Sequence, residues 1–337
     1  MNRRILLARR PTGMPVAEDF AFDEAPLPEP AEGEVRVRHR FLSLDPYQRG
    51  RMDDAKSYAK PVPLGGVMEC QAVGQVEASR DGRFREGDWV LGGFGWQTHS
   101  VRPGAALIAI DPAEAPPSTA LGVLGMPGLT AWVGLEDIGQ PKAGETVVVS
   151  AASGAVGQVV GQLARIRGAR AVGVAGGAAK CAFVTGELGF EACLDHRGSD
   201  LGAALDAACP EGVDVYWENV GGAVQAAVFP RLRDFGRMVM CGMIAQYNTT
   251  SGAAATGAPP GPNLGPVVRK RLRIQGFIVN DTGWPRYARF RAEMLGHIAA
   301  GRLRWREDVV RGLDAAPTAF MGLLEGRNFG KLIVALD

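Results

Sequence analysis

The stretch TVVVSAASGAVGQVVGQLAR, Thr146 to Arg165, decides the fold of this chain. An apolar, strand-like run meets small residues with two glycines, and an amphipathic run without proline follows. Strand, tight turn and helix in this order are typical of a dinucleotide-binding turn, where unpaired N–H groups of the helix N-terminus bind phosphate. Gly154 is expected to let the backbone approach a pyrophosphate, and Gly157 to let the helix pack on its sheet. Ala152 replaces the first glycine of such a turn, and a GxxG pattern alone fits an ordinary strand-to-helix turn equally well.

Beyond this turn, strand-like runs alternate with helical ones. We expect helices over 156–167 and 180–188, and strands at RAVGVA, EACLD, DVYWEN, GRMVMCG and LRIQGFIVN. Strands separated by helices predict a parallel, doubly wound sheet with right-handed crossovers. The Gly-, Pro- and Ala-rich stretch 249–266 is predicted to be a long loop with a function of its own.

The first third of the chain carries β signals instead. GEVRVRHRFLSL alternates apolar and polar residues, and AVGQVEAS, GDWVLGGFG and WQTHSV are short strand-like runs between turn residues. We therefore predict an α/β protein with a small β-barrel or sandwich over residues 1–122 and a dinucleotide-binding domain over 123–299. Residues 300–337 are expected to return to the first domain through the strand-like NFGKLIVALD.

The composition fits an ordinary globular protein, with 46% hydrophobic residues, 22% charged residues and a formal net charge of +1. Such a charge provides no general attraction for nucleic acid or an anionic membrane. No apolar run approaches the roughly 20 residues of a membrane helix, and MNRRILLARRP has too short an apolar run for a signal peptide. We expect a cytoplasmic protein without nucleic-acid or membrane partners.

The cysteines and histidines indicate no metal site. The five cysteines form no CxxC pair, and the four histidines lie far apart without an HExxH cluster. The cysteines are expected to be small buried apolar residues rather than a disulfide framework.

The residues after the second strand of the dinucleotide domain indicate NADP(H). NAD-binding turns usually place Asp or Glu there to bind the ribose 2′-hydroxyl. The strand ends instead in VGVAGGAAK, with Lys180 and no acid. An ammonium attracts a 2′-phosphate that a carboxylate would repel, although a solvated helix residue is the alternative for Lys180.

Seven stretches, in order, carry a family resemblance: LSLDPYQRGRM (42–52), GMPGLTAWVGL (125–135), AASGAVGQVVGQLA, ENVGG (218–222), CGMIAQYN (241–248), GFIVND (276–281) and NFGKLIV. Through them nearly the whole chain resembles the medium-chain dehydrogenase/reductase superfamily. Within it, the chain is most similar to the zinc-independent leukotriene B4 dehydrogenase / prostaglandin reductase group, which includes curcumin and alkenal reductases. The resemblance implies a GroES-like β-barrel domain, a Rossmann domain and an active site in the cleft between them. It also implies a homodimer, with RLRIQGFIVN as a sheet-joining edge strand.

The implied reaction is NADPH-dependent reduction of the carbon–carbon double bond in α,β-unsaturated ketones and aldehydes. Zinc-dependent relatives have a cysteine in the early active-site loop and a His-Glu pair shortly after it. Here Asp45 and the run GGVMECQ stand in those places, so no catalytic metal is expected.

The resemblance also implies cofactor-binding residues. Lys180 matches the 2′-phosphate lysine, while Gly177 and His196 replace the serine and tyrosine that the family has beside it. A His196 imidazole N–H can take the place of the tyrosine hydroxyl, or His196 is simply a surface loop residue. The other positions comprise the pyrophosphate turn, the nicotinamide side and the backbone stretch that binds the carboxamide: Gly154, Ala155, Val156, Gly157, Thr130, Asn219, Cys241, Gly242, Tyr247, Phe277, Ile278, Val279 and Asn328.

Tyr47 and Tyr247 are the hydroxyl-bearing candidates for the substrate side. Hydride transfer to the β-carbon leaves negative charge on the carbonyl oxygen, which a hydroxyl stabilises; either ring is equally suited to be an aromatic wall for a flat substrate. Arg49 and Arg51 are weaker candidates, as contacts for an acidic substrate tail. A quinone reductase of the same superfamily and a non-catalytic NADPH-binding protein remain the alternative functions.

Overall fold

The computed structural model describes residues 1–198, 200–248 and 264–336. Contacts divide the described chain into two compact units. Residues 1–121, 247–248 and 307–336 form the first unit, and residues 122–198, 200–246 and 264–306 the second. The return to the first unit thus begins at Glu307 rather than at residue 300. Most of the loop predicted at 249–266 lies outside the described residues.

The first unit is mostly antiparallel. Its larger sheet has the order β14-β15-β3-β4-β5-β7, with β6 paired to β3, and β1 and β2 form a two-stranded sheet. The strands are β1 (Asn2–Leu7), β2 (Phe20–Ala25), β3 (Glu34–Ser43), β4 (Gln71–Ser79), β5 (Trp89–Gly93), β6 (His99–Pro103), β7 (Ile108–Ile110), β14 (Glu307–Arg311) and β15 (Lys331–Ala335). The helices are α1 (Gln48–Arg51) and α10 (Ala316–Leu324), with short 3-10 turns at Ala17–Asp19, Gly104–Ala106, Pro117–Leu121 and Leu313–Ala315.

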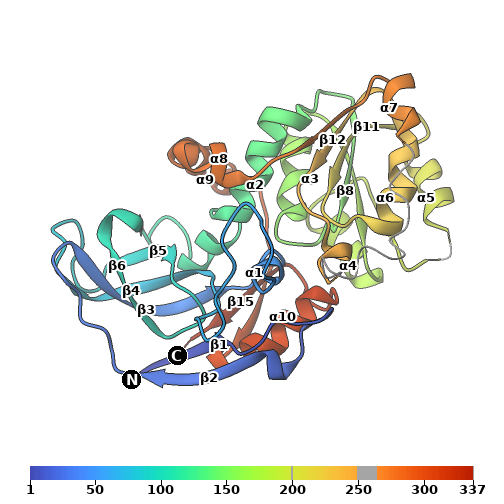
Figure 1. Ribbon diagram of the computed structural model, residues 1–337. Helices are drawn as coiled ribbons and strands as arrows, with labels where there is room; N and C mark the ends of the chain where they lie inside the picture. Colours follow the sequence, from blue (N-terminus) through green and yellow to red (C-terminus); the bar gives the residue numbers. More distant parts are fainter. Residues whose placement is uncertain (199, 249–263, 337) are drawn as a thin grey trace. The chain divides into compact units, whose positions relative to one another are not determined.

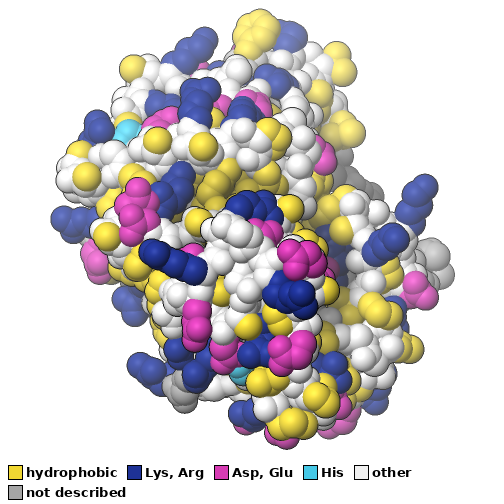
Figure 2. Space-filling model, turned by 90° about the vertical axis from the view of Figure 1, so that its left-hand side faces the viewer, with side chains coloured by type: hydrophobic (Ala, Val, Ile, Leu, Met, Phe, Trp, Pro, Cys, Tyr) yellow, Lys and Arg dark blue, Asp and Glu magenta, His cyan; other side chains and the backbone are white. Residues whose placement is uncertain are grey.

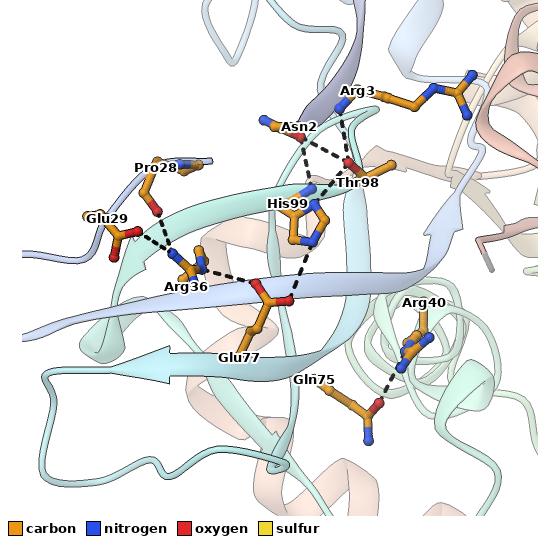
Figure 3. A network of polar contacts seen from close by, with 10 residues as sticks. All are labelled: Asn2, Arg3, Pro28, Glu29, Arg36, Arg40, Gln75, Glu77, Thr98 and His99. Atoms are coloured by element: carbon orange, nitrogen blue, oxygen red, sulfur yellow. Dashed lines mark hydrogen bonds and ion pairs between the residues drawn. The ribbon is translucent and has the colours of Figure 1, made fainter. Parts of the chain in front are cut away.

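Buried and less buried residues alternate along β3, so one face of this strand packs on the core of the unit. Val35 and Val37 are fully buried in the core, whereas Arg36 between them forms polar contacts. Arg36 donates to Glu77 of β4 at 3.0 Å and to Glu29 at 2.8 Å, as Figure 3 shows. The core beneath the sheet contains the buried Trp96. Its indole ring packs between the rings of Phe20 and Phe320, at centroid distances of 5.6 and 5.5 Å.

The second unit is built on a six-stranded parallel sheet of order β10-β9-β8-β11-β12-β13. Its strands are β8 (Thr146–Ser150), β9 (Arg170–Ala175), β10 (Ala192–Asp195), β11 (Val213–Glu218), β12 (Leu232–Met240) and β13 (Arg273–Gly276). In chain order this is 3-2-1-4-5-6, the strand order of a Rossmann fold. The predicted doubly wound parallel sheet is confirmed.

Helices cover both faces of this sheet. Figure 1 shows α2 and α3 on one side and α5 and α6 on the other. The helices are α2 (Met126–Gly134), α3 (Gly157–Ile166), α4 (Ala178–Gly186), α5 (Leu201–Ala208), α6 (Gly222–Val228), α7 (Gly265–Arg269), α8 (Val279–Thr282) and α9 (Tyr287–Ala299). A π-helical turn at Leu135–Gly139 extends α2, and 3-10 turns lie at Phe229–Arg231, Ile244–Gln246 and Trp284–Arg286.

The central strands β8, β9 and β11 are rich in buried β-branched residues because both of their faces are covered. The predicted sixth strand, LRIQGFIVN, is shorter than expected. β13 ends at Gly276, and Val279 already begins α8.

The charged side chains are mixed on the molecular face drawn in Figure 2. Basic and acidic groups alternate over that face, in keeping with the net charge of +1. No helix among the described residues combines the length and the apolar character that a membrane crossing requires.

Candidate active site

The turn between β8 and α3 is packed so closely that Gly157 has no room for a side chain. A Cβ on Gly157 would lie 2.3 Å from the carbonyl oxygen of Ala151. The Gly154 N–H donates to the same oxygen at 2.9 Å, and Ala155 and Val156 lead into α3, which begins at Gly157. The turn is therefore a backbone cradle at the N-terminus of a ten-residue helix, a geometry that fits a pyrophosphate.

The left-handed residue of this turn is Ala151, one position earlier than the sequence pattern indicates. Ala151 has φ of 49°, whereas Ala152 is fully buried. A Cβ added to Gly173 of β9 would lie 2.8 Å from the Cβ of Ala152. Ala152 is thus a small packing residue against β9, rather than a poor substitute for a turn glycine.

Polar side chains link the carboxyl ends of β8 and β11, the two strands between which the strand order reverses. Asn219 Nδ2 donates to the Ser150 carbonyl at 2.6 Å, and Trp217 Nε1 donates to Asn219 Oδ1 at 3.1 Å. The fully buried Glu218 carboxylate accepts from Ser150 Oγ at 2.9 Å and from the Tyr216 hydroxyl at 2.7 Å. Ligands of doubly wound sheets bind in the crevice at such a point, so Asn219 is held rigidly where the sequence predicts a cofactor contact.

The chain leaves β12 beside the same network. The N–H groups of Cys241 and Gly242 donate to the Glu218 carbonyl at 2.9 and 3.1 Å. Burial raises the pKa of the Cys241 thiol to about 12, so the thiol is protonated at neutral pH and is no nucleophile. The stretch predicted to line the nicotinamide half is therefore fixed by backbone hydrogen bonds, and Tyr247 follows one 3-10 turn later.

Thr130 and the stretch Phe277–Val279 belong to the same unit. Thr130 is buried in α2, and its hydroxyl donates to the Met126 carbonyl at 2.7 Å. The Phe277 ring packs edge-on against Trp217, with ring centroids 6.1 Å apart. Phe277 and Ile278 lie between β13 and α8, outside the strand ladder, and their binding of the carboxamide stays a prediction.

The residues predicted to bind a 2′-phosphate gather at the carboxyl end of β9. Gly177 has φ of 95° and precedes α4, and Lys180 lies in the first turn of that helix. His196 directly follows β10, and a Cβ added to Gly176 would lie 2.8 Å from His196 Nε2. The structure thus brings His196 onto the Gly176–Gly177 turn. The assignment of these residues to the cofactor stays a prediction.

In the first unit, a buried ion pair holds the loop that carries Tyr47. Lys331 Nζ lies 2.7 Å from Asp45 Oδ1 and 2.8 Å from the Leu44 carbonyl oxygen, with both charged side chains buried. Burial and the nearby Asp45 carboxylate raise the pKa of Tyr47 well above its usual value, so its hydroxyl stays protonated. The position that the resemblance compares with a zinc-binding cysteine is occupied by a carboxylate paired with an ammonium.

Arg49 and Arg51, the weaker candidates for an acidic substrate tail, are buried rather than exposed on the surface. Arg49 Nη2 donates to the Gly13 carbonyl at 2.8 Å. Arg51 Nε donates to Glu69 at 2.7 Å, and its guanidinium lies 4.3 Å from the centroid of the Tyr58 ring. Both guanidiniums are used inside the unit because burial of a charge requires such partners.

Tyr247 belongs to the same unit as Tyr47. The neighbouring Asn248 Nδ2 lies 3.2 Å from the sulfur of Met14, and Gly13 in turn accepts from Arg49 of the Tyr47 loop. The structure therefore brings the segments of both tyrosines onto the 13–14 loop. Asn328 also lies in this unit, where its Nδ2 donates to the Gly330 carbonyl at 2.9 Å.

Sequence reasoning missed two residues of these sites. Glu218 is at the centre of the network at the strand ends, and Arg197 lies over the Gly176–Gly177 turn. The acid beside Asn219 in ENVGG was a signal for the first, and the basic pair His196-Arg197 after a strand was one for the second. Among the described residues, no three His, Cys, Asp or Glu side chains are grouped so that they could hold a metal ion.

Two family models match the chain. Residues 3–110 match the N-terminal domain of oxidoreductases, and residues 155–296 match a domain described as zinc-binding dehydrogenase. An NADPH-dependent curcumin reductase of Escherichia coli is 47% identical over 99% of this chain and 96% of its own length. A 2-alkenal reductase (NADP(+)-dependent) of Nicotiana tabacum is 38% identical over 100% and 98%.

A solved structure is similar to this chain to the same degree. The crystal structure of CurA from Vibrio vulnificus in complex with NADPH is 48% identical, covers 99% of each chain and superposes with a TM-score of 0.93. Identity at this level over the full length shows common descent, and the two-unit architecture is the one expected from the resemblance. This chain belongs to the zinc-independent medium-chain dehydrogenase/reductases, in the group of the curcumin, alkenal and prostaglandin reductases.

Proposed function

We propose that this protein is an NADPH-dependent reductase of the carbon–carbon double bond in α,β-unsaturated ketones and aldehydes. The observation that carries the proposal is the full-length similarity to curcumin and alkenal reductases. The Rossmann switch point of the second unit, with its Gly157 cradle, supports the cofactor. Its partners are then a small enone or enal and NADP(H).

We assign cofactor binding to residues of the second unit and contacts with the substrate to residues of the first. When bound, NADPH supplies the hydride that reaches the β-carbon. We assign the pyrophosphate to the 154–157 turn, the 2′-phosphate to Lys180 and the nicotinamide side to Asn219 and the stretch after β12. Internal hydrogen bonds from Asn219 to Ser150, and from the Cys241 and Gly242 N–H groups to Glu218, hold these segments in place.

We assign the substrate side of the site to the two tyrosines of the first unit. As the hydride adds, an enolate develops on the carbonyl oxygen, and a hydroxyl donor stabilises it. We assign this donor to Tyr247 or to a cofactor hydroxyl, and we assign Tyr47 to packing against the substrate. The α-carbon then takes a proton.

The test is NADPH consumption with a panel of enals, enones and quinones. We expect turnover with enones and enals, products that keep the carbonyl and lack the double bond, and deuterium from C4-labelled NADPH at the β-carbon. Dialysis against a strong chelator should leave this activity unchanged. Turnover with quinones alone, or activity lost to the chelator and restored by zinc, would contradict the proposal.

Tyrosine variants assign the roles within the same assay. Tyr247→Phe should lower turnover about 10²- to 10³-fold if its hydroxyl serves the oxyanion. Tyr47→Phe should be nearly silent, while Tyr47→Ala should raise the Michaelis constant for the enone. Full activity of the alanine variants at both positions would show that these tyrosines do not form the substrate site.

We also propose a cytoplasmic homodimer. Five free thiols suit a reducing compartment. β13 lies at an edge of the described six-stranded sheet, and its Ile274 side chain is 38% exposed. An apolar residue on an unpaired edge strand suits sheet-to-sheet pairing with a second copy of the chain.

A further inference from the structure

Arg197 stands over the turn that leads into α4. A Cβ built on Gly176 would lie 3.2 Å from Arg197 Nε and 3.4 Å from its Cζ, and one built on Gly177 would lie 3.7 Å from Nη1. The guanidinium therefore lies over two consecutive glycines: a Cβ at Gly176 would crowd it, and one at Gly177 would be in van der Waals contact with it. Arg197 and Lys180 approach this turn from different elements, one from the loop after β10 and the other from the first turn of α4.

The carboxylate of Asp195 lies at the same turn, next to the positive charge of Arg197. Asp195 Oδ1 accepts from the Gly177 N–H at 2.9 Å and from the Arg197 N–H at 3.0 Å. These two backbone hydrogen bonds lower the pKa of Asp195, so its carboxylate is ionised at neutral pH. Arg197 adds a permanently charged guanidinium beside this carboxylate and over the glycine turn.

We propose that Arg197 is a second cationic ligand of the 2′-phosphate and a determinant of the preference for NADP(H) over NAD(H). The inference rests on the cofactor assigned in the proposed function. A planar guanidinium matches two phosphate oxygens with parallel N–H donors, which an ammonium does not. Arg197 supplies this fork beside Gly177, the position where the family has a serine.

Calorimetric binding of nucleotide fragments tests the assignment without any turnover. The probes are 2′,5′-ADP, which carries the 2′-phosphate, and 5′-AMP, which lacks it. Arg197→Gln should weaken 2′,5′-ADP binding about ten- to a hundredfold and leave 5′-AMP binding unchanged. Arg197→Lys should recover part of the loss because it restores the charge but not the fork. Arg302→Gln, on an exposed arginine after α9, is the matched control and should bind both probes as the natural chain does.

The opposite change should act in the opposite direction. Asp195→Asn keeps an oxygen that accepts from both N–H groups but removes the negative charge, so it should tighten 2′,5′-ADP binding several-fold and not 5′-AMP binding. An unchanged ratio of the two affinities in Arg197→Gln, whether both fall or neither does, would overturn the proposal. A chain that fails to reduce enones but shows the predicted fragment ratios would refute the proposed reaction and leave this site in place.

Discussion

Ala151 and Gly157 show how single residues shape the phosphate turn. Ala151 holds a left-handed backbone, which costs an alanine roughly 1–2 kcal/mol relative to its preferred conformation. Gly157 approaches the Ala151 carbonyl so closely that no Cβ fits between them. Gly157 is therefore needed for the close approach of the backbone. Ala151 adopts the strained conformation, and the surrounding hydrogen bonds hold it in place.

Another single residue, His39, links stability to pH. Its ring is 1% exposed; Nδ1 donates to the Gln97 carbonyl over 2.6 Å, and Nε2 accepts from Ser100 Oγ over 2.8 Å. Burial lowers the pKa of His39 to about 3. The folded chain therefore keeps this imidazole neutral at a pH where the unfolded chain protonates it.

We expect His39 to destabilise the protein in mild acid. Stability from this group is complete above pH 6.5 and falls by up to about 1.4 kcal/mol per pH unit as the pH decreases from there toward 3. Urea unfolding of the natural chain and of His39→Gln, measured between pH 7 and pH 5, isolates the effect, because all other titrations are shared. The variant should lose less stability over that range. Parallel pH profiles would show that His39 is protonated in the folded state.

At the scale of elements, the C-terminal strand β15 anchors the loop that carries Tyr47. β15 pairs antiparallel with β3, and Lys331 at its start reaches the Asp45 carboxylate in the loop that follows β3. Gln48 fastens the same loop, since its Nε2 donates to the Ser43 carbonyl at 3.0 Å. The last strand of the chain therefore determines where an early loop lies.

Removal of one partner of this buried pair should be costly. Lys331→Met leaves the Asp45 carboxylate buried without a counter-charge and should lower the free energy of unfolding by about 3–5 kcal/mol. The double variant Lys331→Met, Asp45→Asn should recover much of that loss, because no unpaired charge remains. Chemical denaturation measures both. A loss below about 1 kcal/mol in the single variant would mean that water reaches the carboxylate.

At the scale of the whole molecule, each of the two larger sheets has an edge strand to which a second copy of the chain could pair. β13 ends the parallel sheet of the second unit, and β14 ends the sheet of the first. Both edges expose one β-branched residue, Ile274 at 38% and Val309 at 46%. These residues form a matched pair for testing which edge joins two copies.

Ile274→Lys should convert a dimer to a monomer, because it places a charge on the edge that we assign to pairing. Val309→Lys, on the other edge, should leave the dimer intact. Light scattering coupled to size-exclusion chromatography gives the mass of each variant. A monomeric natural chain, or a dimer that only Val309→Lys dissociates, would contradict the assignment.

The sequence by itself determined the type and order of the main elements and the chemistry of the cofactor. The 146–165 stretch specifies strand, turn and helix through local periodicity, and Lys180 in place of an acid indicates a phosphate ligand, because both signals lie within a few residues. Only the tertiary structure decided that Ala152 packs against β9, that Arg49 and Arg51 are internal, and that Lys331 reaches Asp45. Those roles depend on partners far away in the chain, and a side chain's environment is fixed by whichever segments the fold brings to it, which no local pattern encodes.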